Sequence, residues 1–261
     1  MEKKDIYNDD FYRNRDSKTK NSAKRIGSII NEQYAFKSAV DIGCGVGTWL
    51  REFGELGARD VLGIDGSWVN KDFLVIDKDR FVSQDLTQKI QANRRFDIAI
   101  SLEVAEHLPE NRAHGFISDL CNLSDVVLFS AATKKQGGDA HINEQRASYW
   151  KSIFRENGYS IFDVVRPIIW NDIDIPVWYR QNIFVYVNSN NKAASAIFEA
   201  MRQNQECVID MIHPQLYEEK IVDYEYRLHE AQAELDKFRH EMSLPLHRKF
   251  YNWLRKGLTK K

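Results

Sequence analysis

The chain has 261 residues, of which 43% are hydrophobic and 12% aromatic, and its formal net charge is −1. This composition supports one large folded domain, with or without an appendage, and it excludes a disordered chain and a globally basic nucleic-acid coat. The three cysteines form no CxxC pair, which argues against a zinc ribbon or disulfide scaffold, and no apolar run approaches the ~20 residues of a membrane span. The polar start also lacks the apolar core of a signal peptide, so we expect a cytoplasmic protein.

The chain begins with a polar segment and a predicted helix, and an alternation of short apolar and amphipathic segments follows. Residues 1–21 are polar and mixed in charge, and a helix is predicted from Ser22 to Ile30. From Ser38 onward, short β-branched runs alternate with amphipathic stretches, which is the pattern of α/β units. The predicted strands are Ala39–Ile42, Val61–Ile64, Arg80–Ser83, Phe96–Ser101, Val126–Ser130, Ile161–Arg166 and Asn182–Val187, and the predicted helices are Thr48–Leu56, Ala113–Cys121 and Gln145–Asn157.

These elements predict a single open α/β sheet of seven strands with helices packed on it. No clear helix separates the last two predicted strands, so we expect them to form a hairpin-like pair at one edge. The α/β pattern ends near residue 188, where the turn-forming segment Asn188–Asn191 follows.

Residues 193–243 predict a helical extension with a heptad pattern. The residues that recur at seven-residue intervals are Ile221, Leu228, Leu235 and Met242, interleaved with Tyr224, Ala231 and Phe238. This is the a/d pattern of a coiled coil, and the pairs Lys220–Glu225 and Glu234–Arg239 would attract each other between parallel copies. We therefore expect a homo-oligomer held by this helix; a helix docked on the parent domain is the alternative.

Residues 244–261 form a basic tail that carries six Lys or Arg residues and no acid. Leu246, Phe250, Trp253 and Leu254 align on one helical face. A basic amphipathic segment of this kind suits an anionic membrane surface, so we expect peripheral contact at the inner face of the membrane. A solvated C-terminus is the alternative.

The segment VDIGCGVGTWL, residues 40–50, is the most informative motif. A buried strand leads into Gly-x-Gly-x-Gly and then into a helix, and such glycines let the backbone approach a ligand closely. Asp65 ends the next strand about 20 residues later, where a carboxylate can accept both hydroxyls of a ribose. Asp41 would repel a pyrophosphate but suits a cationic amino group, as in S-adenosylmethionine (SAM). A structural glycine turn in another α/β protein is the alternative.

The segment resembles the first motif of class I SAM-dependent methyltransferases, and the resemblance covers residues 22–188. Gln84-Asp85-Leu86 looks like the segment that contacts the adenine amino group. The resemblance implies a Rossmann-like seven-stranded sheet with helices on both faces and an antiparallel last strand. The cofactor-binding residues that it implies are Asp41, Gly43, Gly45, Asp65, Gly66, Asp85, Leu86 and Leu102.

Glu103, Glu106 and His107 follow the fourth predicted strand with i, i+3, i+4 spacing, which places them on one face of a helical turn. His141 follows the fifth strand and could complete a Glu/Glu/His/His site. The set resembles the metal site of small-RNA 3′-end 2′-O-methyltransferases, and its first three residues resemble ubiquinone-biosynthesis O-methyltransferases.

This second resemblance implies Mg²⁺ or another divalent ion bound by Glu103, Glu106, His107 and His141. Such an ion lowers the pKa of an alcohol, and Glu106, His107 or His141 could then take the proton. The alternative is a metal-free element in which a histidine orients the loop or acts as the base.

Five further segments resemble bacterial methyltransferases associated with surface-polysaccharide biosynthesis: Gly63–Trp68, Phe129–Ala132, Asp139–Gln145, Ser148–Trp150 and Trp178–Asn182. This resemblance implies a sugar, or a phosphate on a sugar, as the acceptor. Trp170, Trp178, Tyr179 and Arg180 are candidates to bind it, or they are core residues. No RNA-binding motif is present, so a nucleic-acid partner is not expected.

The sequence thus predicts a SAM-dependent O-methyltransferase that acts, with a divalent metal, on a sugar hydroxyl of a surface polysaccharide or its precursor. One alternative is a metal-free methyltransferase that acts on a small metabolite or sugar phosphate. Another is a non-catalytic SAM-binding scaffold that recruits glycan enzymes to the membrane.

Overall fold

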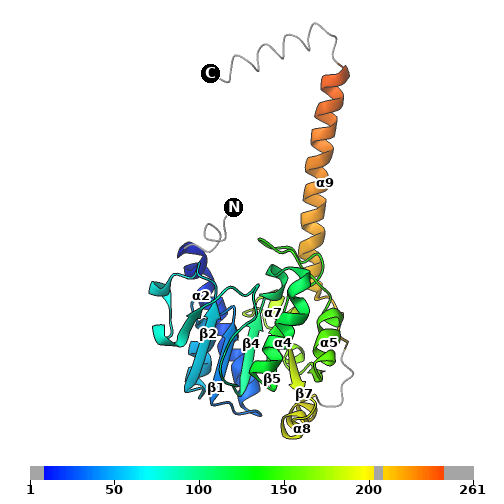
Figure 1. The fold of residues 1–261 in the computed structure, drawn as a ribbon. Coiled ribbons are helices and arrows are strands. Elements are labelled where there is room, and N and C mark those ends of the chain that lie inside the picture. Colours follow the sequence, from blue (N-terminus) through cyan, green and yellow to red (C-terminus); the bar gives the residue numbers. More distant parts are fainter. Residues whose placement is uncertain (1–8, 203–207, 244–261) are drawn as a thin grey trace. The chain divides into compact units, whose positions relative to one another are not determined.

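The computed structural model describes residues 9–202 and 208–243 (Figure 1). The predicted basic tail, residues 244–261, lies outside this range. Tertiary contacts divide the chain after His213 into two units, and the unit that begins at Pro214 contains helix α9 (Pro214–Ser243). Within the described residues, no helix is both long and apolar enough to cross a membrane.

Seven strands form one sheet in the order β3-β2-β1-β4-β5-β7-β6. The strands are β1 (Ser38–Ile42), β2 (Asp60–Asp65), β3 (Phe81–Ser83), β4 (Ile98–Leu102), β5 (Val126–Ser130), β6 (Tyr159–Phe162) and β7 (Phe184–Asn188). The first five are parallel neighbours, whereas β7 runs antiparallel to both β5 and β6. The predicted Rossmann-like sheet with an antiparallel last strand is therefore confirmed.

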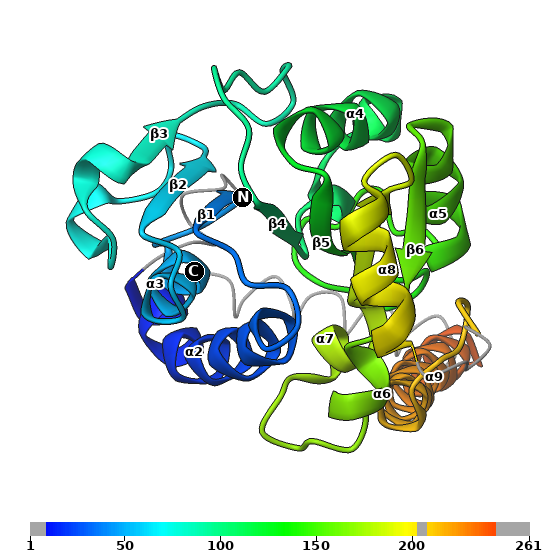
Figure 2. The ribbon, with the colours of Figure 1, turned by 90° about the horizontal axis from the view of Figure 1, so that it is seen from below.

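Helices cover both faces of the sheet (Figure 2). The helices of the first unit are α2 (Asp9–Asn31), α3 (Thr48–Glu55), α4 (Ala113–Leu123), α5 (Ala147–Glu156), α6 (Arg166–Ile169), α7 (Val177–Asn182) and α8 (Lys192–Met201). One apolar cluster joins the sheet to α2, α3 and α8, and a second joins its other face to α4 and α5. The strands are buried from both sides, which explains their near-continuous apolar sequences.

Three expectations differ from the structure. The helix predicted from Ser22 is the second half of α2. The described residues of the extension predicted for 193–243 contain two helices, α8 and α9, of which α8 belongs to the first unit. Strand β6 ends at Phe162, four residues earlier than predicted, and α6 and α7 lie between β6 and β7. Pro167 suits the first turn of a helix, where its missing N–H is not needed, so the chain turns into α6 instead of extending β6.

Arg166 connects the segment between β6 and β7 to the core. Its side chain is 1% exposed and donates to both carboxylate oxygens of Asp163, at 3.0 and 2.6 Å. It also donates to the carbonyls of Gln181 and Val208, at 3.2 and 2.9 Å, and its guanidinium stacks on the Phe184 ring. One buried cation therefore fixes the start of α6, the end of α7 and the segment after α8.

We expect Arg166→Leu to lower the free energy of unfolding by about 3–5 kcal/mol, because it leaves a largely buried carboxylate and two carbonyls without their donor. Urea denaturation followed by circular dichroism measures this change. The matched control is Arg155→Leu at an exposed position on α5, expected to stay within about 0.5 kcal/mol of wild type. Equal unfolding midpoints for the two variants would contradict the role assigned to Arg166.

Candidate active site at the carboxyl ends of the strands

The glycine loop joins β1 to α3 in a backbone conformation that requires glycine. Gly43, Gly45 and Gly47 have φ angles of 86°, 54° and 89°, in the left-handed region. A Cβ atom on Gly43 would overlap the side chain of Val104, which follows β4. The loop therefore passes close to the end of β4, with its backbone accessible to a ligand at the carboxyl edge of the sheet.

Asp65 at the end of β2 holds this loop in place. Its carboxylate accepts hydrogen bonds from the backbone N–H groups of Gly45, at 2.7 Å, and Gly66, at 2.6 Å. The indole of Trp68 lies against Gly66, where a Cβ atom would overlap it. The structure thus brings Asp65 and Gly66 together with the glycine loop.

Asp41 on β1 is 3% exposed. Burial, and then the negative charge of Asp65, raise the pKa of Asp41 well above its usual range. A cation placed beside it would favour the charged carboxylate again. This environment matches the prediction that Asp41 faces a cationic group.

The other predicted cofactor residues lie near the ends of β3 and β4. Leu86 and Leu102 are buried, whereas Asp85 is exposed. The carboxylate of Asp85 accepts hydrogen bonds from the backbone N–H and the hydroxyl of Thr87, both at 2.9 Å to Oδ1. Asp85 therefore has a fixed orientation in a turn after β3.

Glu103 follows β4 in an unusual conformation, with a φ angle of 56°. Its backbone N–H donates to the carbonyl of Ser130 at 3.0 Å, and the 3₁₀ turn begins only at Ala105. Glu103 thus precedes the turn, and the expectation of one helical face shared with Glu106 and His107 is wrong. Its carboxylate accepts hydrogen bonds from Gln136 at 3.1 Å and Asn182 at 3.2 Å.

Glu106 is fully buried, and within the described part of the chain neither carboxylate oxygen has a hydrogen-bond partner. Burial, and then the charge of Glu103, raise the pKa of Glu106 well above its usual range. The nearby backbone amides of Glu106 and Ala132 offset only part of this effect. A buried carboxylate without a donor is costly in free energy, which favours a cation beside it.

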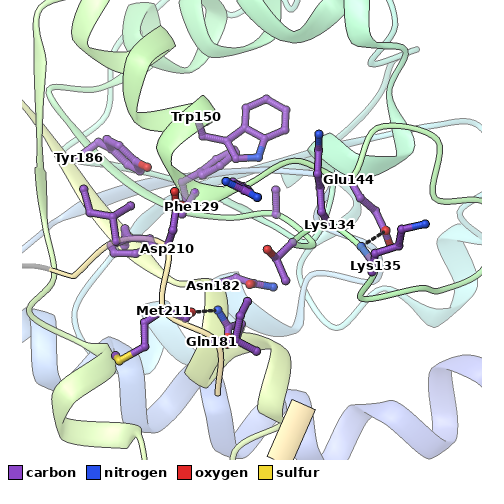
Figure 3. A pocket seen from close by; sticks show the side chains of 17 residues that line it. Phe129, Lys134, Lys135, Glu144, Trp150, Gln181, Asn182, Tyr186, Asp210 and Met211 are labelled. Carbon is purple, nitrogen blue, oxygen red and sulfur yellow. Dashed lines mark hydrogen bonds between the residues drawn. The ribbon is translucent and has the colours of Figure 1, made fainter. Parts of the chain in front are cut away.

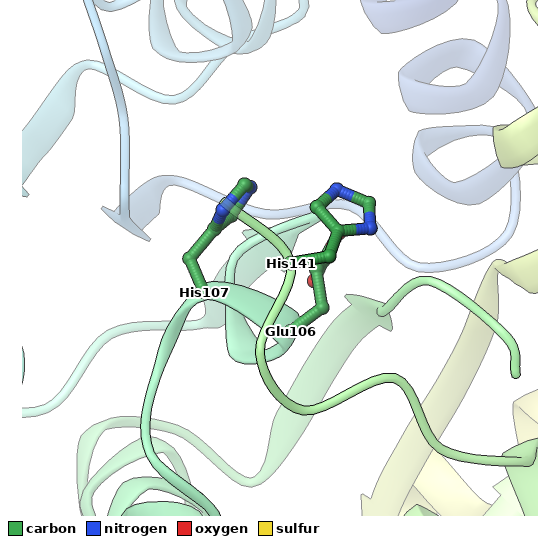
Figure 4. Close-up of side chains that lie close together, drawn as sticks. All are labelled: Glu106, His107 and His141. Carbon is green, nitrogen blue, oxygen red and sulfur yellow. The ribbon is translucent and has the colours of Figure 1, made fainter. Parts of the chain in front are cut away.

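The loop after β5 brings His141 to this carboxylate (Figure 4). The backbone N–H groups of Ile142 and Asn143 both donate to the Glu106 carbonyl, at 2.9 and 3.0 Å. The rings of His107 and His141 lie edge to face with centroids 4.8 Å apart. The expected meeting of the two loops is therefore present in the structure.

One ligand atom from each of Glu106, His107 and His141 lies within 4.8 Å of the others. The Nδ1–H group of His141 donates to Glu144 at 2.9 Å, which leaves the Nε2 lone pair of His141 for a metal or a proton. Two imidazoles and an unpartnered carboxylate are a donor set that fits a divalent cation. Glu103 is not a member of this group, although its charge acts on Glu106.

Sequence reasoning missed three residues that support the cluster: Gln136, Glu144 and Asn182. Glu144 was recognisable only by its position three residues after His141. Asn182 lies 79 residues from Glu103, and nothing in the sequence connects the two.

Of the four residues that were candidates either to bind the acceptor or to belong to the core, Tyr179 and Arg180 are buried, whereas Trp170 and Trp178 are half-buried. Arg180 is 4% exposed and donates to the carbonyls of Ile175 and Trp170, at 2.9 and 3.1 Å. Tyr179 is buried and packs edge-on against Trp49, with centroids 5.5 Å apart. Their burial arises because α6 and α7 fold back onto the sheet.

Comparison with solved structures shows the same fold. An O-methyltransferase family protein from Burkholderia thailandensis is 12% identical with a TM-score of 0.52, over 72% of this chain and 60% of that chain. A chain of the complex between the Haloferax volcanii Trm112 methyltransferase activator and a putative methyltransferase is 14% identical with a TM-score of 0.53, over 72% and 98%. The SAM-bound magnesium protoporphyrin IX methyltransferase from Synechocystis is 21% identical with a TM-score of 0.48, over 66% and 80%.

No curated protein matches the sequence significantly. Residues 11–164, more than half of the chain, match a family model described as a methyltransferase domain. The matched segment contains the glycine loop and the Glu106 cluster, and the seven-stranded sheet agrees with it. The chain therefore belongs to the methyltransferase domain family.

Proposed function

We propose that the protein transfers a methyl group from SAM to a hydroxyl of a sugar, within a surface polysaccharide or its precursor, with the help of a divalent cation. The observation that carries this proposal is the buried, unpartnered carboxylate of Glu106 beside His107 and His141. This donor set suits metal-assisted deprotonation of an alcohol. The sugar acceptor rests on the resemblance of the segments around Ser148–Trp150 to polysaccharide-associated methyltransferases.

The glycine loop and Asp65 would hold the cofactor. Asp41 would face the cationic amino acid portion of SAM, and the Asp65 carboxylate would accept the ribose hydroxyls. Both Asp65 oxygens already accept a backbone N–H, and each has a further lone pair for a hydroxyl donor. Gly66, Asp85, Leu86 and Leu102 would surround the adenine.

Glu106 and His107 would hold the cation, which leaves the single Nε2 lone pair of His141 to take the proton. When bound, SAM supplies the methyl group and the cation lowers the pKa of the acceptor hydroxyl. His141 is the better candidate for the base, because its hydrogen bond to Glu144 fixes the ring and stabilises the imidazolium that forms when it takes the proton. Gln136 and Asn182 would hold Glu103 near Glu106, where its charge favours a cation.

Glu106→Gln tests the buried carboxylate. In EDTA, we expect this variant to melt above wild type, by a margin that grows from pH 5 to pH 8. The pKa of Glu106 is raised in the folded state, so wild type loses stability as the pH rises from the ordinary Glu value of ~4.3 through the raised value. Each kcal/mol corresponds to ~2–4 °C in calorimetry.

The same melts with excess Mg²⁺ or Mn²⁺ test the metal. Wild type is expected to gain stability from the ion, and Glu106→Gln is expected to gain much less. Glu110→Gln, the same change at an exposed position, serves as the matched control and should behave as wild type. A metal-induced shift that persists in Glu106→Gln would remove Glu106 from the ligand set.

Methyl transfer tests the activity and separates it from cofactor binding. Asp65→Asn should weaken SAM binding by at least about tenfold in calorimetry, because it removes a charged acceptor of hydrogen bonds. Glu106→Ala should keep SAM affinity within about threefold of wild type but abolish transfer of labelled methyl. Asp79→Asn, at an exposed position, is the control for both measurements.

The acceptor follows from labelling separated fractions of lipid-linked glycans, RNA and small metabolites, each with Mg²⁺ or with EDTA. Label in the glycan fraction that EDTA abolishes is the expected outcome. Label that resists EDTA would discard the metal, and label confined to another fraction would discard the glycan. SAM binding without label in any fraction would favour the non-catalytic scaffold.

We also propose that α9 joins two parallel copies of the chain. Its heptad residues are exposed: Leu228 is 70%, Phe238 61% and Met242 59% exposed. The g and e positions, Lys220 with Glu225 and Glu234 with Arg239, carry opposite charges that a second parallel copy would pair. A second copy of this helix is therefore the partner that the surface fits.

Light scattering after size exclusion tests this association. Wild type is expected to elute as a dimer and the double variant Leu228→Glu/Leu235→Glu as a monomer, because charges at a/d positions oppose burial. Tyr226→Glu/Ala233→Glu adds the same charge to the opposite face and should remain dimeric. A monomeric wild type, or a dimer that survives the a/d changes, would contradict the coiled coil.

A further inference from the structure

The first unit contains a cavity of about 810 Å³ that has no role in the reactions described so far. It lies between the end of β5, the start of α5, the end of α7 and the segment 209–212 that follows α8 (Figure 3). Neither Asp65 nor any residue of the glycine loop lines this cavity. Its volume is large enough for a sugar with a charged substituent.

The inner wall of the cavity is aromatic and contains an unpartnered donor. Phe129, Trp150 and Phe184 are each at most 2% exposed. Within the described residues, the buried indole N–H of Trp150 has no hydrogen-bond acceptor. Its nitrogen faces the space enclosed by the lining side chains (Figure 3). An oxygen atom of a ligand would satisfy this N–H, whose burial without an acceptor is unfavourable.

The rim of the cavity is basic. Lys134, Lys135 and Arg146 line it, and in the described part of the chain none of their side chains forms an ion pair. The two lining acids, Glu144 and Asp210, already accept backbone hydrogen bonds from Lys135, at 2.9 Å, and Ser148, at 2.9 Å. Three cations against two acids leave a net positive rim, which favours an anionic group.

Two lining residues also contact the candidate catalytic cluster. Asn182 donates to Glu103 at 3.2 Å, and Glu144 accepts from His141 at 2.9 Å. A ligand in the cavity would therefore lie one side chain away from His141, the proposed base, and from Glu103, whose charge acts on Glu106.

We propose that this cavity binds the acceptor as an acidic sugar, one that carries a phosphate or a carboxylate. The anionic group lies at Lys134, Lys135 and Arg146, and a sugar oxygen accepts from the Trp150 N–H. This assignment rests on the proposed function for the identity of the acceptor as a sugar. It adds the charge of the acceptor and the residues that select it.

The test is binding, measured without methyl transfer. In ¹⁵N NMR spectra of the full chain, the Trp150 indole resonance, identified by its loss in Trp150→Phe, should shift with glucose 1-phosphate or glucuronate. Glucose should shift it much less at equal concentration. Comparing the two acidic probes identifies whether the anion is phosphate or carboxylate.

The triple variant Lys134→Ser/Lys135→Ser/Arg146→Ser should weaken binding of the acidic sugar by at least about tenfold. The matched control Lys20→Ser/Lys24→Ser/Lys89→Ser removes the same charge from exposed positions elsewhere and should bind as wild type. Binding unaffected by the rim variant would overturn the proposal. Inorganic phosphate binding as tightly as glucose 1-phosphate would overturn the sugar part, and an unmoved Trp150 resonance would overturn it entirely.

The outcomes of this experiment distinguish a failure of the cavity assignment from a failure of the proposed function. If acidic sugars bind here but no sugar fraction accepts methyl, the methylation proposal is wrong and the cavity assignment stands. If a neutral sugar accepts methyl while the cavity binds no acidic sugar, the cavity assignment is wrong and the methylation proposal stands.

Discussion

The two hydrogen bonds that the Glu106 carbonyl accepts, from Ile142 and Asn143, are the contact on which the candidate site depends. They join the loop after β4 to the loop after β5 and bring His141 beside His107. The Glu106 side chain is itself fully buried, where its charge is unfavourable unless a cation compensates it. The backbone contact and the buried charge thus occur at the same residue.

The site contains two pairs of neighbouring acids, Asp41 with Asp65 and Glu106 with Glu103, and the two pairs have the same arrangement. In each pair, one carboxylate is held by hydrogen bonds: Asp65 by backbone amides, and Glu103 by Gln136 and Asn182. Its partner, Asp41 or Glu106, is buried and has a pKa raised first by burial and then by the neighbouring acid. Both arrangements favour an incoming cation, which is consistent with a cationic cofactor at one pair and a metal at the other.

Much of this arrangement was predictable because β1, β4 and β5 are parallel neighbours whose carboxyl ends meet. Strand β2 is parallel to β1 as well, so residues at or just beyond the ends of these strands, such as Asp65 at the end of β2 and His141 after β5, must converge at one edge. The contribution of Asn182 was not predictable, because Asn182 ends helix α7, whereas the sequence predicted it as the first residue of a strand. The left-handed conformation of Glu103 could not be predicted either, because it accompanies a backbone hydrogen bond to Ser130, which lies far away in the sequence.

Among the described residues, the non-glycine residues with positive φ are Glu103, Lys135 and Ala140, and all three belong to the two loops of the site. Such conformations are unfavourable and persist where surrounding contacts fix them. Lys135 and Glu144 show how: the Lys135 backbone N–H donates to the carboxylate that also accepts from His141. The rim of the cavity and the orientation of the His141 imidazole therefore share one carboxylate. If the acceptor binds in the cavity as proposed, a ligand anion that repositioned Lys135 would act on His141 through Glu144, and acceptor binding would be coupled to the alignment of the proposed base.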